Sequence, residues 1–382
     1  MTDSYTSLWA SDLHMNNNLP HARPTSHGRT DRMEDQIKLW GRFRDVALKV
    51  KAEDFWIPGD LFDHGAADAV TLAETARLMA DFPIDQIVVP GNHDAHSING
   101  GRFNLEAFGW LATNVKYVGG RRPEPVQPRP WLVFWPVEFM PVDETMAAIR
   151  DIRERIADGL PATTGERMDV LVLHNAIVGC SHVGWVCDSG LDADEVCEGF
   201  DYVIAGHFHD HQTFGPDGRG MYLGAPMHHR FDDAGRRAGF WSLKFTEGKG
   251  MSKKWYNGQA PTFQNVNHDD PTIEDIVDAL SPGDYLRIKV NATHSEWVGL
   301  RRDVFDVAQQ LRTEHELRVS VTHKPIYHHT SRIKSHGKMG VSTMDENVDN
   351  YIESPEVDTT GLDIKKLKSI GRAALAHARS ET

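Results

Sequence analysis

Three things are scarce in this chain of 382 residues: cysteine, long apolar runs and positive net charge. The three cysteines lack Cys-x-x-Cys spacing, so we expect reduced thiols rather than disulfides or a cysteine-bound metal. No apolar stretch approaches the ~20 residues of a membrane helix. The first residues, Met1 to Ser4, carry neither a basic nor an apolar signal region. The sequence therefore predicts a cytoplasmic protein without a membrane part.

The charge balance restricts how the chain can bind nucleic acid. Its 55 acidic residues outnumber its 41 lysines and arginines, and the formal net charge is -14. A DNA-binding protein that acts alone is expected to be basic. Three alternatives stay open: bound metals and a local basic strip bind DNA, a partner supplies the DNA-binding surface, or the substrate is small.

Short apolar runs recur along the chain, and five of them end in side chains that bind metals. Such runs, bounded by turn residues, are typical of strands covered on both faces. Ligands bind at the carboxyl ends of such strands, so we expect these side chains to meet at one edge of a sheet. Imidazole and carboxylate together suit Mn, Zn or Fe. The candidate ligands are Asp12, His14, Asp60, Asn92, His174, His207 and His209.

The motifs D-x-H, G-D-x-x-D, G-N-H-D, H and G-H-x-H, in this order, resemble the calcineurin-like metallophosphoesterases. Within that superfamily the chain is most similar to the SbcD-type DNA repair nuclease subunits, which include the recombination endonuclease subunit of T-even phages. Two segments carry this finer resemblance: Gly-Asp-Leu-Phe-Asp at residues 59–63, and Tyr-Leu-Gly-Ala-Pro at residues 222–226 followed by Phe231-Asp232. The resemblance implies an α/β fold, a two-sheet metallophosphoesterase sandwich flanked by helices.

The resemblance also implies a dinuclear metal site. Asp12, His14, Asp60 and His209 would bind one ion, while Asp60, Asn92, His174 and His207 would bind the other. Asp60 would bridge the two ions, because two close cations need a shared anion. The expected ions are two Mn²⁺, with Mg²⁺, Zn²⁺ or Fe²⁺ as alternatives.

Other residues near these motifs are candidates for catalysis or substrate binding. The resemblance makes His93 a general acid or hydrogen-bond donor, and Asp63 the carboxylate that orients it. His64 stands where protein phosphatases carry a phosphate-binding arginine, which argues against a phosphoprotein phosphatase. Arg23 and Arg29 lie in a polar loop that is either solvated or in contact with a phosphate backbone. Solvent exposure explains three further histidines equally well: His211, His228 and His229.

We expect four parts: a nuclease domain at 1–250, a small α+β capping domain at 270–328, a linker at 329–358 and a partner-binding helix at 359–382. Helices are expected at residues 34–51, 68–82, 144–156, 298–311 and 362–379 from their apolar periodicity. The proline-rich residues 122–130 are expected to be neither strand nor helix. Antiparallel strands at 212–223 and 239–246 would complete a second sheet.

These observations together predict a metal-dependent DNA exonuclease and endonuclease. By resemblance, its partners are DNA, an SbcC-like coiled-coil ATPase and a second copy of the nuclease subunit, with no membrane. One alternative is a metallophosphodiesterase or phosphatase that acts on small nucleotides, which the acidic charge favours. Another is a non-catalytic scaffold that retains the fold.

Overall fold

The computed structural model describes residues 3–19, 21–25, 28–95, 113–182, 184–326, 349, 352–353 and 363–380. It forms two compact units. The first contains Met1–Val290 and Leu300–His323, and the second contains Asn291–Gly299 and Lys324–Thr382. Most of the expected linker at 329–358 lies outside the described residues, and the expected domain boundaries stay predictions.

The first sheet of the larger unit has the strand order β14-β13-β1-β2-β3-β4. Strands β1 to β4 run parallel, whereas β13 pairs antiparallel with β1, and β14 antiparallel with β13. The bounds are β1 Ser4–Trp9, β2 Asp54–Pro58, β3 Asp85–Val89, β4 Val115–Tyr117, β13 Gly239–Thr246 and β14 Gly250–Asn257.

The second sheet has the order β11-β12-β10-β7-β6-β5. Its inner strands β6, β7, β10 and β12 are parallel, and β5 and β11 pair antiparallel at the two edges. The bounds are β5 Val126–Arg129, β6 Leu132–Val137, β7 Met168–His174, β10 Tyr202–Gly206, β11 Gln212–Phe214 and β12 Gly220–Tyr222. A small hairpin, β8 (Ser181–His182) and β9 (Trp185–Val186), follows β7.

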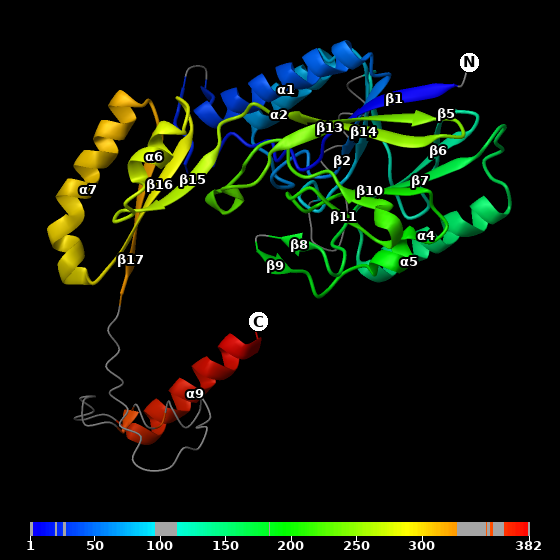
Figure 1. Ribbon diagram of the computed structural model, residues 1–382. Helices are drawn as coiled ribbons and strands as arrows, with labels where there is room; N and C mark the ends of the chain where they lie inside the picture. The colour runs from blue at the N-terminus through cyan, green and yellow to red at the C-terminus, as the bar shows by residue number, and fades with distance from the viewer. Residues whose placement is uncertain are drawn as a thin grey trace. The chain divides into compact units, whose positions relative to one another are not determined.

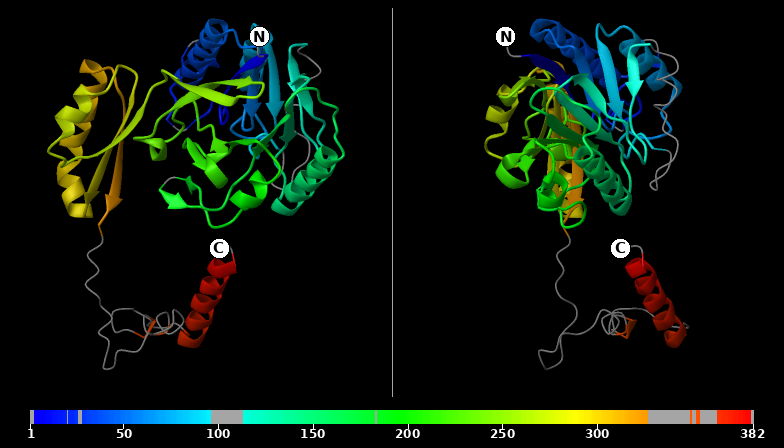
Figure 2. Two further views of the ribbon diagram at one scale, coloured as in Figure 1. Left: turned by 45° about the vertical axis from the view of Figure 1, so that its right-hand side comes forward. Right: turned by 90° about the vertical axis from the view of Figure 1, so that its right-hand side faces the viewer.

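Helices cover the outer faces of both sheets, so the larger unit has four layers (Figures 1 and 2). Helices α1 (Asp31–Val50) and α2 (Ala69–Ala80) cover the first sheet, and α4 (Val142–Ala157) and the short α5 (Ala193–Cys197) cover the second. The mixed α/β sandwich predicted from the sequence is therefore confirmed. Helix α1 begins where the Thr30 side chain accepts a hydrogen bond from the backbone of Met33, and it ends at Lys51 in the left-handed conformation.

Each central strand is apolar on both faces, which explains the continuous apolar runs. In β2, Phe55 and Ile57 pack beneath α1 and α2, while Trp56 points into the layer between the sheets. There Trp56 stacks on Trp9, with ring centroids 5.0 Å apart. Each such side chain contributes about 1.5–3 kcal/mol on full burial. This packing holds the two sheets face to face and fixes where their strands end.

A third sheet, with the order β15-β16-β17, comprises Phe263–Asn267, Tyr285–Ala292 and Arg318–Pro325. Its helices are α6 (Ile273–Asp278) and α7 (His294–Glu314). Within the larger unit, Phe263 stacks on Tyr285 and meets Phe231 of the 3₁₀ helix η3 (Phe231–Asp233) edge-on. Arg318 pairs with Asp31 and Asp35 at the start of α1. These contacts join the third sheet to the sandwich.

Two predictions about strands are wrong. Residues 126–129 form the strand β5 in spite of Pro128, because β5 is an edge strand whose register shifts at this place, and a proline is tolerated there. Residues 239–246 form β13, which joins the first sheet beside β1 instead of completing the second. The long pairing between β13 and β14 extends that first sheet.

The described part of the second unit includes the helix α9 (Ile364–Ser380). It was expected at residues 362–379. Lys368 and Arg372 on α9 pair with Glu353 and Asp349, which precede it. Ile364 and Ile370 are exposed. Among the described helices, none is long and apolar enough to cross a membrane.

Candidate metal centre

The candidate ligands come together where strands of two sheets end. Asp12, Asp60 and Asn92 follow β1, β2 and β3 of the first sheet, whereas His174 and His207 stand at the ends of β7 and β10 of the second. The sequence predicted a single sheet edge. The structure instead joins two edges, because the sheets pack face to face with their parallel strands ending on the same side.

The backbone at this place is unusual, because positive φ angles occur at Asp12, His14, Asp60 and His207. Such angles in non-glycine residues cost about 1–3 kcal/mol each and often mark functional sites. The loops are also closely packed. A Cβ on Gly91 would lie 2.2 Å from Oδ1 of Asp60, so only glycine fits there.

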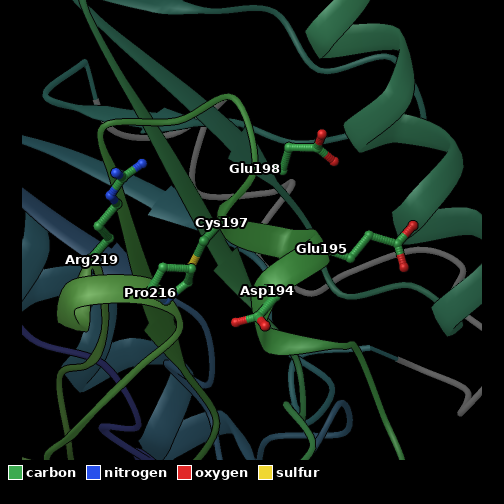
Figure 3. A pocket seen from close by; sticks show the side chains of 6 residues that line it. All are labelled: Asp194, Glu195, Cys197, Glu198, Pro216 and Arg219. Atoms are coloured by element: carbon green, nitrogen blue, oxygen red, sulfur yellow. The ribbon is translucent and has the colours of Figure 1, made fainter.

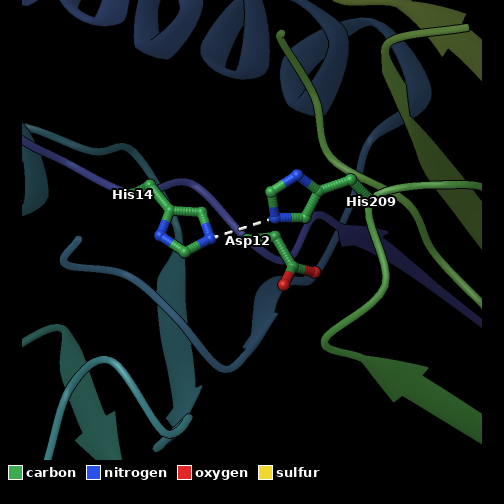
Figure 4. Close-up of side chains that lie close together, drawn as sticks. All are labelled: Asp12, His14 and His209. Atoms are coloured by element: carbon green, nitrogen blue, oxygen red, sulfur yellow. Dashed lines mark hydrogen bonds between the residues drawn. The ribbon is translucent and has the colours of Figure 1, made fainter. Parts of the chain in front are cut away.

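Asp12, His14 and His209 form one group of possible metal ligands (Figure 4). Nε2 of His14 lies 3.2 Å from Nε2 of His209. The Asp12 carboxylate accepts hydrogen bonds from the Ser11 hydroxyl and from the backbone N–H of His207. Two imidazole nitrogens that face each other beside a carboxylate are a suitable set of donor atoms for a divalent cation.

Asp60, His174 and His207 form a second group. Oδ2 of Asp60 lies 3.1 Å from Nε2 of His174 and 3.7 Å from Nε2 of His14, so this one carboxylate reaches both groups. Oδ1 of Asn92 lies 3.1 Å from Nε2 of His174 and 3.0 Å from Nδ1 of His207. Asp60 therefore occupies the position expected of a bridging ligand.

The charges in this second group are strongly coupled. Burial alone would lower the pKa of His174, but the Asp60 carboxylate outweighs it and raises that pKa to about 9. In turn, His174 and His14 overcome the effect of burial on Asp60 and hold its pKa well below the usual range. Burial and the neighbouring His174 lower the pKa of His207 to about 4. Asp60 is thus ionised and His207 neutral, which are the forms that bind cations. Without a cation, His174 carries a second proton, on Nε2 towards Asp60, and a bound ion would displace that proton.

The residues fit two divalent ions on their own chemistry. Nδ1 of His174 contacts the carbonyl oxygen of Pro58 at 2.9 Å, so its proton is held there and Nε2 faces Asp60 and Asn92. The first group would hold one ion and the second group the other, with Asp60 shared. These roles remain predictions, and the structure supplies their geometry.

His93 and Asp63 are close together, although their contact differs from the predicted one. Nδ1 of His93 contacts the backbone carbonyl of Asp63 at 2.6 Å, rather than its carboxylate. The carboxylate instead accepts a hydrogen bond from Asn16 and lies 3.3 Å from Nδ1 of His14. Asp63 therefore orients His93 through its backbone and His14 through its side chain.

The candidate substrate-binding residues lie apart from these groups. Arg29 pairs with Glu34 at 2.9 Å and with Glu74 at 3.3 Å, and Arg23 and His64 are exposed. None of the three lines the cavity beside the candidate ligands. The arginine that does so is Arg230, which precedes η3.

Several residues that support the site were missed or misread in the sequence. Asp233 lies 3.3 Å from Nδ1 of His209 and accepts hydrogen bonds from the backbone of His229 and Arg230. His229 and His228 are buried, so solvent exposure, one of the two explanations left open for them, does not apply. Nε2 of His229 contacts the carbonyl of Asp12 at 2.8 Å.

Asp94 was also missed. Its carboxylate accepts hydrogen bonds from the backbone of Phe62 and Gly91, at 2.9 Å each, and thereby ties together the two loops that carry Asp60 and Asn92. The only sequence signal was its place directly after Gly-Asn-His.

The candidate ligands open into a cavity of about 380 Å³. On one side it is lined by His14, Asp60, His93, His207 and His209. The remaining wall is formed by Ala176, His182, Trp185, Cys187, Ser189, Phe208, Arg230, Asp232 and Asp233.

A cavity of about 440 Å³ beside α5 lacks this chemistry (Figure 3). Its carboxylates, from Asp194, Glu195 and Glu198, point in different directions, and the side chain of Cys197 reaches towards Pro216. Burial raises the pKa of the Cys197 thiol to about 11, so it is protonated at neutral pH. All three cysteines are free and buried.

A match to a known protein family agrees with this geometry. The family model described as calcineurin-like phosphoesterase matches residues 6–211, more than half of the chain. Among solved structures, a dimetal phosphatase from Danio rerio is similar at 11% sequence identity and a TM-score of 0.38, covering 67% of this chain and 97% of that one. No curated protein matches in sequence. With the family model spanning all five motifs, the chain belongs to the calcineurin-like phosphoesterases.

Proposed function

We propose that this phosphoesterase is a metal-dependent DNA nuclease of the SbcD type, with exonuclease and endonuclease activity. The family binds two divalent metal ions, and the two groups that share Asp60 provide candidate ligands for them. Mn²⁺ is the ion we propose. Two bound ions would stabilise the charge of the phosphate and activate the attacking water.

The charge of the cavity wall is the observation that supports a phosphodiester as the substrate. Among the described residues that line it, Arg230 is the one arginine or lysine, against the carboxylates Asp60, Asp232 and Asp233. A phosphomonoester dianion would gain from further cationic side chains, because charge-assisted contacts hold phosphates. A diester carries a single negative charge and needs fewer. The wall therefore favours a phosphodiester over a phosphomonoester.

The chain's own residues have distinct roles in this proposal. His93 donates through Nδ1 to the carbonyl of Asp63, so Nε2 is the atom that can carry a proton to the leaving oxygen. His93 lines the cavity, as such a donor must. Arg230 would contact a non-bridging phosphate oxygen or the neighbouring phosphate.

The SbcD-type resemblance is supported by the place of its second motif. The backbone N–H of Ala225, within residues 222–226, donates to the carbonyl of His209 at 3.0 Å. The same segment leads to η3, which contains Asp233 beside His209. Asp232 of this motif lines the cavity, and residues 222–226 contact the loop that carries His209. DNA, an SbcC-like ATPase and a second copy of this chain stay predicted partners.

The second candidate is a phosphodiesterase or phosphatase for small nucleotides, and the net charge of -14 favours it. A single assay separates the two. Purified protein with Mn²⁺ is offered labelled duplex DNA, single-stranded DNA and cyclic dinucleotides in parallel. Cleavage of DNA is expected, and cleavage of cyclic dinucleotides alone would support the small-nucleotide enzyme.

The Asp60→Asn variant tests the metal-dependent chemistry in the same assay. An amide bridges two cations poorly and removes one charge, so we expect loss of hydrolysis and of metal binding. Asp85→Asn, at an exposed residue of β3, is the matched control and should keep full activity. Hydrolysis at the wild-type rate by Asp60→Asn would show that the dinuclear assignment is wrong.

A further inference from the structure

The hairpin β8–β9 presents an exposed tryptophan at the cavity beside the candidate metal ligands. The side chain of Trp185 is 51% exposed, whereas Trp9, Trp40, Trp56 and Trp135 are fully buried. Leaving so large an apolar ring in water forgoes the stabilisation that its burial would give. Its position in the cavity wall suggests that a ligand covers it.

The hairpin is held at its base by two sets of contacts. The side chain of Gln212 on β11 accepts a hydrogen bond from the backbone N–H of Ser181 at 2.7 Å and donates one to its carbonyl at 2.8 Å. Directly beside this contact, Cys180 and Cys187 pair through their backbones and lie in the core of the second sheet. The strands that carry His182 and Trp185 are thus anchored to the second sheet.

A chain of rings connects Trp185 to the candidate ligands. The ring of His182 lies 5.9 Å from that of Trp185, edge-on, and also 5.9 Å from that of His209. On its other side His182 stacks on Phe208 at 5.2 Å, with the planes 26° apart. Trp185 is therefore separated from a candidate metal ligand by one ring, a distance that a sugar and a base can span from a bound phosphate.

We propose that Trp185 and His182 form a binding site for a nucleobase of the substrate, next to the phosphate that is cleaved. The site rests on the proposed function and adds to it how the enzyme recognises its substrate. Aromatic side chains stack on bases of any sequence, because every base has a π-face. Arg230, in the same cavity, would contact a non-bridging oxygen of that phosphate.

Two synthetic diesters test this site. Thymidine 5′-(4-nitrophenyl phosphate) carries a base, and methyl 4-nitrophenyl phosphate does not, while both release the same chromophore. With Mn²⁺, the wild type should have a higher kcat/KM for the thymidine ester. Trp185→Ala should reduce this preference by about 5- to 150-fold, the range for loss of one stacked base. Trp185→Phe, which keeps a ring, should retain most of it.

Val186→Ala is the matched control, because Val186 lies on the same strand, is exposed and is not part of the cavity wall. It should leave the preference unchanged. An unchanged preference in Trp185→Ala, or an equal loss for both esters, would overturn the base site. The two proposals can fail separately. If the wild type cleaves no DNA but Trp185→Ala still reduces the preference for the thymidine ester, the proposed nuclease is refuted and the base site is kept.

Discussion

At the scale of single residues, two of the candidate ligands are each oriented by a partner that holds the opposite edge of the imidazole ring. The carbonyl of Pro58 fixes His174, and the carboxylate of Asp233 fixes His209. Burial alone would lower the pKa of His209, but Asp233 outweighs burial and raises it. A carboxylate behind a ligating imidazole also increases its affinity for metal.

Asp233→Asn should therefore weaken the binding of one metal ion. An amide keeps the shape but no longer supports a strongly basic imidazole, so we expect about 10- to 100-fold lower affinity at the His209 group. A calorimetric titration of the metal-free variant with Mn²⁺ should show one site with weakened affinity and one with normal affinity. Asp85→Asn, at an exposed carboxylate that is not part of the cavity wall, is the control. Two unchanged sites would contradict the role of Asp233.

His93 can be separated from the ligands by experiment, although it lies near them. His14, Asp60 and His93 are close enough to form a third possible metal group. If His93 acts in the chemical step, His93→Ala should keep its metal content and its affinity for substrate while kcat falls about 10²- to 10⁴-fold. Elemental analysis and single-turnover kinetics measure the two effects. Loss of metal from the variant would make His93 a ligand.

At the scale of elements, the junction between β1 and β2 contains a buried acid that is not part of the site. Asp54 on β2 accepts a hydrogen bond from the hydroxyl of Tyr5 on β1, and burial raises the pKa of Asp54 to about 7. The folded protein thus keeps a proton that the unfolded chain loses near pH 4. The contribution of Asp54 to the free energy of unfolding is therefore complete below pH 4 and declines as the pH rises to 7.

Asp54→Asn should remove this dependence, since an amide resembles the protonated acid. Between pH 4.5 and 7.5 the wild type should lose about 3 kcal/mol of stability that the variant keeps. Thermal unfolding with EDTA at both pH values measures the difference. Asp85→Asn, at the exposed residue paired with Asp54 in the sheet, controls for the loss of a nearby charge. Equal pH dependence in wild type and Asp54→Asn would refute the raised pKa.

The same scale shows what the sequence could and could not predict. The parallel strands and the helices α1, α2 and α4 were predictable, because apolar periodicity and strand ends are local signals. The edge strand β5 was missed because a proline forbids a central strand but not an edge strand, and the sequence does not reveal which strand is at the edge. The pairing of β13 with β1, over more than 230 residues, has no local signal.

At the scale of the whole molecule, the candidate site depends on packing that joins distant segments. The gathering of Asp12, Asp60 and His174 could be expected from motifs at strand ends. The contact of His229 with the carbonyl of Asp12 spans 217 positions and depends on how the sheets face each other. The same holds for Trp185, because its place near His209 depends on how the hairpin β8–β9 packs against the second sheet. The sequence therefore predicted the candidate ligands, whereas it did not reveal the residues that support them.

The helix α9 provides a prediction about assembly. Its exposed Ile364 and Ile370 lie on the apolar stripe expected from the sequence, and Lys365, Lys366 and Lys368 lie beside that stripe. A helix with exposed apolar positions can fold back on its own chain, bind a membrane surface or lie in a groove of a partner. We favour the partner, because an SbcC-like ATPase would also supply the DNA-binding surface that a chain of net charge -14 lacks.

Truncation after Val357 tests this prediction. The shortened protein should keep its hydrolysis of short single strands, because the candidate metal centre is built from residues 12–233. It should fail to co-purify with the ATPase, and ATP-dependent processing of duplex ends should be lost. Ile364→Asp with Ile370→Asp in the full chain should reproduce this loss, while Lys365→Ala with Lys366→Ala should weaken binding less if apolar burial dominates. Undiminished binding of the ATPase by the truncated protein would move the partner site to the sheet β15-β16-β17.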